Sequence, residues 1–109
     1  MVTTDSVCDL PESLKKKLDI SICPYYVCTD EGRFLDETEL KADSLLMHMA
    51  KGQTGYSQPP EVEDYERFFA EKLTEAQNVI HITMARHVSK GYENALEAAK
   101  SFENVTVLD

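Results

Sequence analysis

The segment from Val79 to Phe102 constrains the fold most strongly, because a strand-like run leads through a polar turn into a helix-like run. Residues 79–83 are mostly β-branched, which is typical of a strand covered on both faces. Apolar residues then recur at helical spacing on one face, at Tyr92, Ala95, Leu96, Ala99 and Phe102. This order predicts a buried strand followed by an amphipathic helix, the repeating unit of an α/β domain.

Ser89 stands at the predicted start of this helix and has two possible roles. As an N-cap, its hydroxyl would accept a hydrogen bond from a first-turn backbone N–H. Alternatively, the open N–H groups and the positive end of the helix dipole would hold a carboxylate or a phosphate. Gly91 would allow another group to approach closely. The residue types alone leave both roles open.

The N-terminal segment repeats the pattern of strand, polar turn and helix. Residues 1–2 resemble the end of a strand, and the polar residues 3–6 follow directly. Leu10, Leu14 and Leu18 recur every four residues and predict a helix with one apolar edge. Asp9 would cap this helix, with Pro11 in its first turn.

A hairpin is predicted next. Residues 20–29 are rich in β-forming residues, although Pro24 lacks a backbone donor and indicates an edge strand or a bulge. A turn over residues 29–32 precedes a short run at 33–35 that can return as an antiparallel strand. We expect this hairpin to be attached to an otherwise parallel sheet.

The remainder of the chain continues the alternation. A helix is predicted over residues 42–51, ended by Gly52, and the turn-rich residues 53–60 follow as a loop. Residues 61–73 predict another helix and residues 105–108 another strand. The buried stripe of the helix over 61–73 is expected to contain Val62, Tyr65, Phe69 and Leu73.

Alternating strands and helices favour a three-layer α/β/α domain with a mainly parallel sheet. Ligands of such sheets bind beyond the carboxyl ends of the strands. Three polar turns would meet at that edge: residues 4–6, residues 57–59 and residues 84–89. Their hydroxyl groups are therefore expected to lie close together.

Composition limits the possible functions. The chain has 109 residues, of which 42% are hydrophobic, enough for one domain with a modest core. Twenty acidic against eleven basic residues give a net charge of −9, which disfavours nucleic acids and anionic membranes as partners. No apolar run approaches the roughly 20 residues needed to cross a bilayer, and no signal-peptide core is present. We expect a cytoplasmic protein without a membrane span.

The cysteines and histidines do not form a recognisable metal or disulfide pattern. Cys8, Cys23 and Cys28 are odd in number and lack C-x-x-C spacing, so we interpret them as buried or half-buried small residues. His48 and His81 have no second ligand at metal spacing, and each is expected to be exposed or partly packed. We therefore expect no metal and no cofactor.

Several motifs, in this order, resemble the N-terminal domain of the DegV family. They are TDSVCDLP near the start, YSQPPEVEDYERFF in the middle, and HITMARHVSKGYENA followed by VTVLD. The order and spacing of the motifs match over essentially the whole chain. This resemblance implies the fold of that domain for residues 1–109.

The resemblance also implies a function. Members of the family bind a long-chain fatty acid in a tunnel, and hydroxyl groups of this domain hold its carboxylate. Some members are the acyl-binding subunit of a bacterial fatty acid kinase. A second domain normally closes the tunnel, so the resemblance implies that residues 1–109 are the N-terminal part of a longer protein, a truncation product, or a half that needs a partner. Without the second domain, the apolar face that it would cover is exposed and is expected to cause self-association.

The family's binding residues transfer to this chain one position at a time. Ser6 and Asp5 match the TDS turn, and Ser57 and Gln58 match the TSQP turn, while Ser89 matches the serine of an SGTY segment. The chain departs from the pattern at Tyr56, where a carboxylate-binding Thr is usual, and at Lys90 and Gly91, which replace Gly-Thr. Ala85 and Arg86 occupy positions that often carry serines. The resemblance implies carboxylate binding by Ser89, Ser57, Tyr56 and Ser6, with Asp5, Gln58 and Arg86 as secondary residues.

Three classes of function remain. A fatty-acid-binding module that presents the carboxylate to a kinase needs an apolar cleft and convergent hydroxyls but no general base, so it is not itself an enzyme. A serine hydrolase needs a G-x-S-x-G elbow, which the sequence lacks, and His87 is too near Ser89 in sequence to be a natural base. A degenerate structural or regulatory domain without bound lipid is compatible with the departures at Tyr56 and Lys90.

Overall fold

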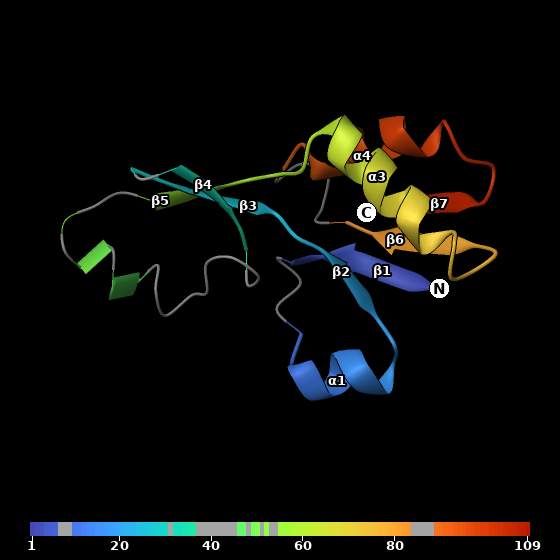
Figure 1. Ribbon diagram of the computed structural model, residues 1–109, viewed down its shortest axis with the longest axis horizontal. Coiled ribbons are helices and arrows are strands. Elements are labelled where there is room, and N and C mark those ends of the chain that lie inside the picture. Colours follow the sequence, from blue (N-terminus) through green and yellow to red (C-terminus); the bar gives the residue numbers. More distant parts are fainter. Residues whose placement is uncertain are drawn as a thin grey trace.

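A four-stranded parallel sheet lies between the helices of the molecule (Figure 1). The computed structural model describes residues 1–6, 10–30, 32–36, 46–47, 49–50, 52, 55–83 and 89–109. The strands in spatial order are β2 (Ser21–Cys23), β1 (Val2–Asp5), β6 (Val79–Ile82) and β7 (Val105–Leu108). Every neighbouring pair is parallel, which confirms the predicted α/β fold with a mainly parallel sheet.

The helices lie on both sides of this sheet. Figure 1 shows α3 (Val62–Lys72) and α4 (Gly91–Ala99) on one face and α1 (Glu12–Lys17) on the other. The core lies under α3 and α4, because the apolar stripes of both helices pack against β6 and β7. Its buried residues are Cys23, Tyr65, Phe69, Val79, Ala95, Ala98, Ala99 and Val105.

The opposite face of the sheet is much less covered. Helix α1 buries none of its residues, and Leu18 just after it is 55% exposed. Burial alternates along β6: Val79 is buried, whereas Ile80 is 42% exposed. Successive side chains of a strand point to opposite faces, so β6 is covered on one face only. The expectation of a strand covered on both faces is therefore wrong.

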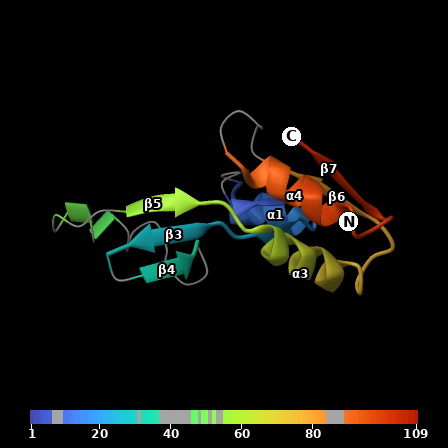
Figure 2. The same ribbon diagram turned by 90° about the horizontal axis from the view of Figure 1, so that it is seen from above.

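A second, antiparallel sheet extends to one side of the parallel sheet (Figures 1 and 2). Its strand order is β4 (Gly32–Leu35), β3 (Tyr26–Thr29) and β5 (Gly55–Gln58). The predicted turn and antiparallel return are confirmed, since Thr29 pairs with Gly32, which adopts a φ of 140°.

Two details of the prediction for this region are wrong. The run 20–29 is divided by Pro24 and Tyr25 into β2 and β3, which belong to different sheets, so the hairpin is not part of the parallel sheet. The expected loop 53–60 contains β5, which pairs with β3 along its whole length. Pro24 offers no backbone N–H, and the chain leaves the parallel sheet at that residue.

The other helices agree with the sequence patterns. Helix α3 buries Tyr65 and Phe69, and Val62 and Leu73 pack against the core as partly buried residues. Most of the helix predicted over residues 42–51 lies outside the described residues, although 46–47 and 49–50 are helical. Among the residues that the structure describes, no helix has the length and hydrophobicity required to cross a membrane.

Candidate functional site

A cleft of about 540 Å³ lies where the end of β5 meets the start of α4. Strand β5 contributes Ser57 and Gln58, and the segment leading into α4 contributes Ser89 and Lys90. The complete lining is Tyr25, Ser57, Gln58, Pro59, Glu61, Ser89, Lys90 and Asn94. Two of the three polar segments expected to converge thus share one cleft.

The Ser89 hydroxyl has two partners in the structure. Its Oγ accepts a hydrogen bond from the Gly91 backbone N–H at 3.1 Å. It also shares a hydrogen bond of 2.7 Å with the hydroxyl of Tyr25. Helix α4 begins at Gly91, and its N-cap residue is Lys90. Ser89, which was predicted to be the N-cap, therefore lies one residue before the N-cap position. It nevertheless makes the expected contact to a first-turn N–H.

Gly91 allows the close approach that its residue type suggested, and the approaching group is Tyr25. A Cβ atom at Gly91 would overlap the Tyr25 hydroxyl and lie 3.3 Å from the Tyr65 hydroxyl. Tyr25 is only 2% exposed, and burial raises its pKa above the ordinary value, while the hydrogen bond to Ser89 acts in the opposite direction. Tyr25 therefore keeps its proton at neutral pH.

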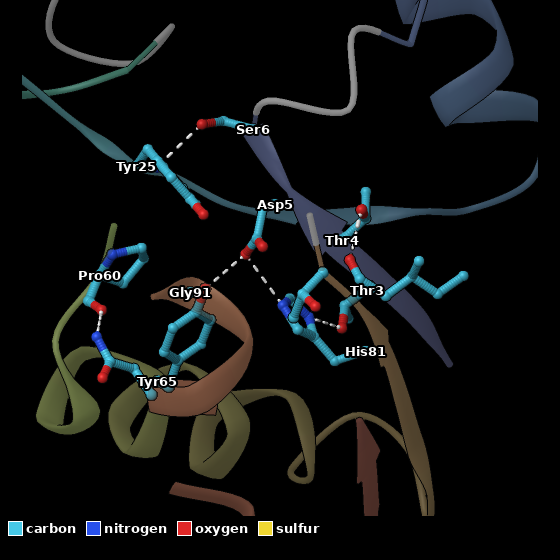
Figure 3. Close-up of polar contacts among 12 residues, drawn as sticks. Thr3, Thr4, Asp5, Ser6, Tyr25, Pro60, Tyr65, His81 and Gly91 are labelled. Atoms are coloured by element: carbon cyan, nitrogen blue, oxygen red, sulfur yellow. Dashed lines mark hydrogen bonds and ion pairs between the residues drawn. The ribbon is translucent and has the colours of Figure 1, made fainter. Parts of the chain in front are cut away.

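Next to this contact lies a buried polar cluster (Figure 3). The Tyr65 hydroxyl donates to Asp5 Oδ1 at 2.8 Å, and His81 Nε2 lies 3.0 Å from the same oxygen. Thr3 Oγ1 lies 2.7 Å from His81 Nδ1. The His81 tautomer with its hydrogen on Nε2 can donate to Asp5 and accept from Thr3. The cluster links β1, β6 and α3.

All four members of the cluster are almost fully buried. Burial, followed by the nearby charge of Asp5, raises the pKa of Tyr65, so its hydroxyl remains a donor. Asp5 Oδ2 has no hydrogen-bond partner among the described residues. The expectation that His81 is exposed or partly packed is wrong, because the alternation of β6 places its ring against Tyr65 and Phe69.

The predicted site residues are divided between different places. Ser57, Gln58 and Ser89 line the cleft described above. Tyr56 is 67% exposed and does not line it, and Asp5 lies in the buried cluster. Arg86 lies outside the described residues.

Ser6 connects indirectly to the cleft. Its Oγ donates to Asp36 Oδ2 at 2.9 Å and accepts from the Tyr25 backbone N–H at 2.9 Å. Ser6 and Ser89 therefore bind Tyr25 at opposite ends, Ser6 at its backbone N–H and Ser89 at its hydroxyl. Ser6 itself lines a different cleft of about 380 Å³ beside α1.

Sequence reasoning did not identify Tyr25, Glu61 and Asn94 as part of the lining. Asn94 donates to the Pro60 carbonyl at 2.9 Å and so ties α4 to the segment after β5. The Glu61 side chain accepts from the Asp64 backbone N–H at the start of α3. Only the position of Tyr25 directly after Pro24, between two strand-like runs, could have indicated that its side chain turns towards the sheet edge.

Within the described part of the chain, no three metal-ligating side chains are grouped. Cys23 and Cys28 are buried and unbridged, and burial raises the pKa of the Cys23 thiol. Cys8, Ala85, His48 and His87 lie outside the described residues. The chemistry that this geometry offers is the donation of hydrogen bonds by hydroxyl, amide and ammonium groups to an anion.

Comparison with known proteins identifies the family of this chain. A family model described as an uncharacterised protein of the DegV family matches residues 1–109. The chain belongs to the DegV family. This membership confirms the resemblance seen in the sequence motifs.

Individual relatives support the same assignment. A DegV domain-containing protein of Clostridium perfringens is 30% identical over 99% of this chain and 40% of its own length. A fatty acid-binding protein of Thermotoga maritima is 28% identical over 94% of this chain and 37% of its own length. The chain therefore spans about two fifths of these relatives.

A solved structure shows the same fold. It belongs to a DegV family protein from Thermus thermophilus described as fatty acid binding. The identity is 29% and the TM-score 0.87, over 100% of this chain and 40% of the other. Its similarity covers both sheets and the helices of the DegV chain described above.

Proposed function

We propose that this chain binds the carboxylate of a long-chain fatty acid in the cleft at the start of α4. The observation that carries the proposal is the presence of Ser57 and Ser89 on one cleft with Lys90. A carboxylate accepts hydrogen bonds from hydroxyls, and the first-turn N–H groups of α4 and the Lys90 ammonium add favourable charge. Ser89 is the first hydroxyl and Ser57 the second.

The other site residues have supporting roles in this proposal. Ser6 Oγ accepts a hydrogen bond of 2.9 Å from the Tyr25 backbone N–H. Ser6 therefore supports the site through Tyr25 without lining the cleft. Gln58 lines the cleft and offers an amide donor. Tyr56 is largely exposed, so its hydroxyl is a less suitable second donor than that of Ser57. Glu61 brings negative charge to the lining, but its carboxylate is used in capping α3.

The acyl chain needs an apolar environment that this cleft does not supply alone. We propose that residues 1–109 act as the N-terminal α/β domain of a longer protein whose second domain completes the tunnel. The lengths of the relatives support this, because they are about two and a half times as long as this chain. The similarity to the Thermus thermophilus protein, which is described as fatty acid binding, supports a fatty acid as the ligand.

The chemical step belongs to a partner in this proposal. The sequence contains neither a phosphate-binding P-loop nor a nucleophile elbow. The DegV chain would present the fatty acid carboxylate to a bacterial fatty acid kinase, in the cytoplasm, and would bind rather than catalyse. A degenerate regulatory domain without lipid is the alternative, and mass spectrometry of organic extracts from the purified protein separates the two.

The central test is the Ser89→Ala variant in the protein expressed at its full natural length. Loss of one hydrogen bond to a charged group costs about 1.5 to 3 kcal/mol, so we expect roughly a tenfold or larger loss of affinity for a long-chain fatty acid. Stability should also fall, because the variant removes the partner of the buried Tyr25 hydroxyl as well as the contact to Gly91. Titration of the fatty acid, followed by calorimetry, measures the effect.

Ser101→Ala is the matched control, since Ser101 is an exposed serine just after the same helix. Its affinity should equal that of the wild type. Equal affinities for Ser89→Ala and the wild type would restrict Ser89 to the start of the helix and contradict the proposed site.

A further inference from the structure

Tyr25 is held at both ends beside the proposed carboxylate site. Its backbone N–H donates to Ser6 Oγ, and its hydroxyl lies 2.7 Å from Ser89 Oγ, a residue 64 positions away in sequence. The ring hydroxyl also packs directly against Gly91, where a side chain would displace it. Figure 3 shows Tyr25 and Gly91. The Tyr25 side chain therefore has little freedom to move away from Ser89.

The direction of the bond between Tyr25 and Ser89 follows from counting hydrogens. A serine hydroxyl has one hydrogen and two lone pairs, and the Gly91 N–H already occupies one lone pair. If Ser89 donated to Tyr25, the tyrosine hydrogen would need another acceptor. Among the described residues the Tyr25 hydroxyl is hydrogen-bonded to Ser89 alone, Asp5 Oδ2 receives no hydrogen bond from it, and Tyr25 is only 2% exposed to water. An unpaired buried donor is costly, so Tyr25 is the donor.

This direction leaves the Ser89 hydrogen without a protein partner in the described part of the chain. Both lone pairs of Ser89 Oγ are occupied, by Gly91 N–H and by the Tyr25 hydroxyl. Ser89 lines the cleft and is partly exposed, so its hydrogen can reach an anion there. A hydroxyl that is also an acceptor of two hydrogen bonds is polarised into a better donor.

We propose that Tyr25 is a positioning residue for carboxylate binding: by donating to Ser89 Oγ, it directs the single Ser89 hydrogen into the cleft. The inference rests on the proposed function, because it assigns how the same site prepares its donor. Tyr25 also lines the cleft, but its hydroxyl is bonded to Ser89 and acts on the ligand through that residue. Its effect must therefore disappear when the Ser89 hydroxyl is removed.

A double-mutant cycle in the protein at its full natural length tests this. Tyr25→Phe keeps the ring and removes the hydroxyl, and we expect roughly a three- to tenfold loss of affinity for a long-chain fatty acid, about the value of one neutral hydrogen bond. In the Ser89→Ala background the same change should alter affinity by less than about twofold. If Tyr25→Phe lowers the fatty acid affinity by the same factor in both backgrounds, the role of Tyr25 is merely structural and the inference is overturned.

Tyr26→Phe is the matched control. It removes the hydroxyl of the adjacent tyrosine, which donates to Asp64 Oδ1 at 2.9 Å and does not line the cleft. Its fatty acid affinity should stay at the wild-type level, and a loss equal to that of Tyr25→Phe would contradict the assignment to Tyr25.

The outcomes separate the two proposals. If the folded wild type binds no fatty acid, the proposed function is contradicted. If the wild type and Tyr25→Phe bind the fatty acid with equal affinity, only the role of Tyr25 is contradicted. If Tyr25→Phe does not fold, Gly91→Ala displaces the Tyr25 hydroxyl while leaving both hydroxyls present. Gly91→Ala should also lower affinity at least threefold, and unchanged affinity would overturn the inference.

Discussion

Individual residues of the DegV chain show how burial controls the polar groups around the site. Tyr65 and Tyr25 are both almost fully enclosed, and burial is the largest cause of the raised pKa of each. Both therefore keep their hydroxyl hydrogen; Tyr65 donates it to Asp5, and Tyr25 shares a hydrogen bond with Ser89. Asp5 receives two donors on Oδ1, which offsets part of the cost of burying its charge.

The raised pKa of Tyr65 predicts a loss of stability in alkali. The folded state keeps the Tyr65 proton above the ordinary pKa of 10.0, while the unfolded chain loses it. The contribution is fully present below pH 10.0 and is lost as the pH rises towards the folded pKa. The free energy of unfolding should fall by about 1.4 kcal/mol per pH unit for this group. Urea denaturation between pH 9 and 11 measures this fall. The free energy of unfolding of Tyr65→Phe should decrease less steeply over the same range.

Strand β6 shows how an element with a uniform composition acquires two different faces. Val79 and His81 point towards α3 and α4, whereas Ile80 and Ile82 point to the side that α1 only lightly covers. Val79, Ile80 and Ile82 are all residues that a fully buried strand would accept. Periodicity could not separate them, because the difference depends on which helices cover each face.

The two faces predict opposite results for the same substitution. Val79→Asp should prevent folding, because an unpaired carboxylate at a position only 1% exposed costs several kcal/mol, out of a total stability of about 5 to 15. Ile80→Asp, at the adjacent position, should retain a cooperative fold since its carboxylate can reach water. Circular dichroism and urea unfolding compare the pair. An unfolded Ile80→Asp protein would show that this face is closed.

At the scale of the whole molecule, the sheet face opposite α3 and α4 carries a row of exposed apolar side chains. Val2 is paired with Ile80, and Ile82 with Leu108, so the strand register places them next to one another. Each is between 39% and 49% exposed. Contiguous apolar surface of this kind marks a contact site or drives association.

A protein consisting of residues 1–109 should therefore self-associate and bind a hydrophobic dye. Sedimentation velocity over a concentration series measures the association, and Ile82→Lys should weaken both effects by placing a charge in the row. Leu96→Lys is the control, because Leu96 is 41% exposed on α4, away from this face. A monomer at high concentration without dye binding would refute the expectation.

The sequence alone determined the α/β order, the bounds of most helices and strands, and Ser57, Gln58 and Ser89 as neighbours. The order and the bounds follow from local periodicity and from turn residues. The convergence was inferred from the rule that parallel strands end at one edge, although Ser57 and Gln58 lie in the antiparallel strand β5. It also indicated the close approach at Gly91 without identifying the approaching group.

Only the tertiary structure decided the contacts between distant segments. The hydrogen bond between Tyr25 and Ser89, the burial of His81 beside Asp5 and the division of residues 20–29 between two sheets each depend on a partner far along the chain. Strand β3 pairs with β5 and does not join the parallel sheet, and β5 was expected to be a loop. Local patterns describe how a segment can fold, whereas the packing free energy of all segments together selects which of them meet.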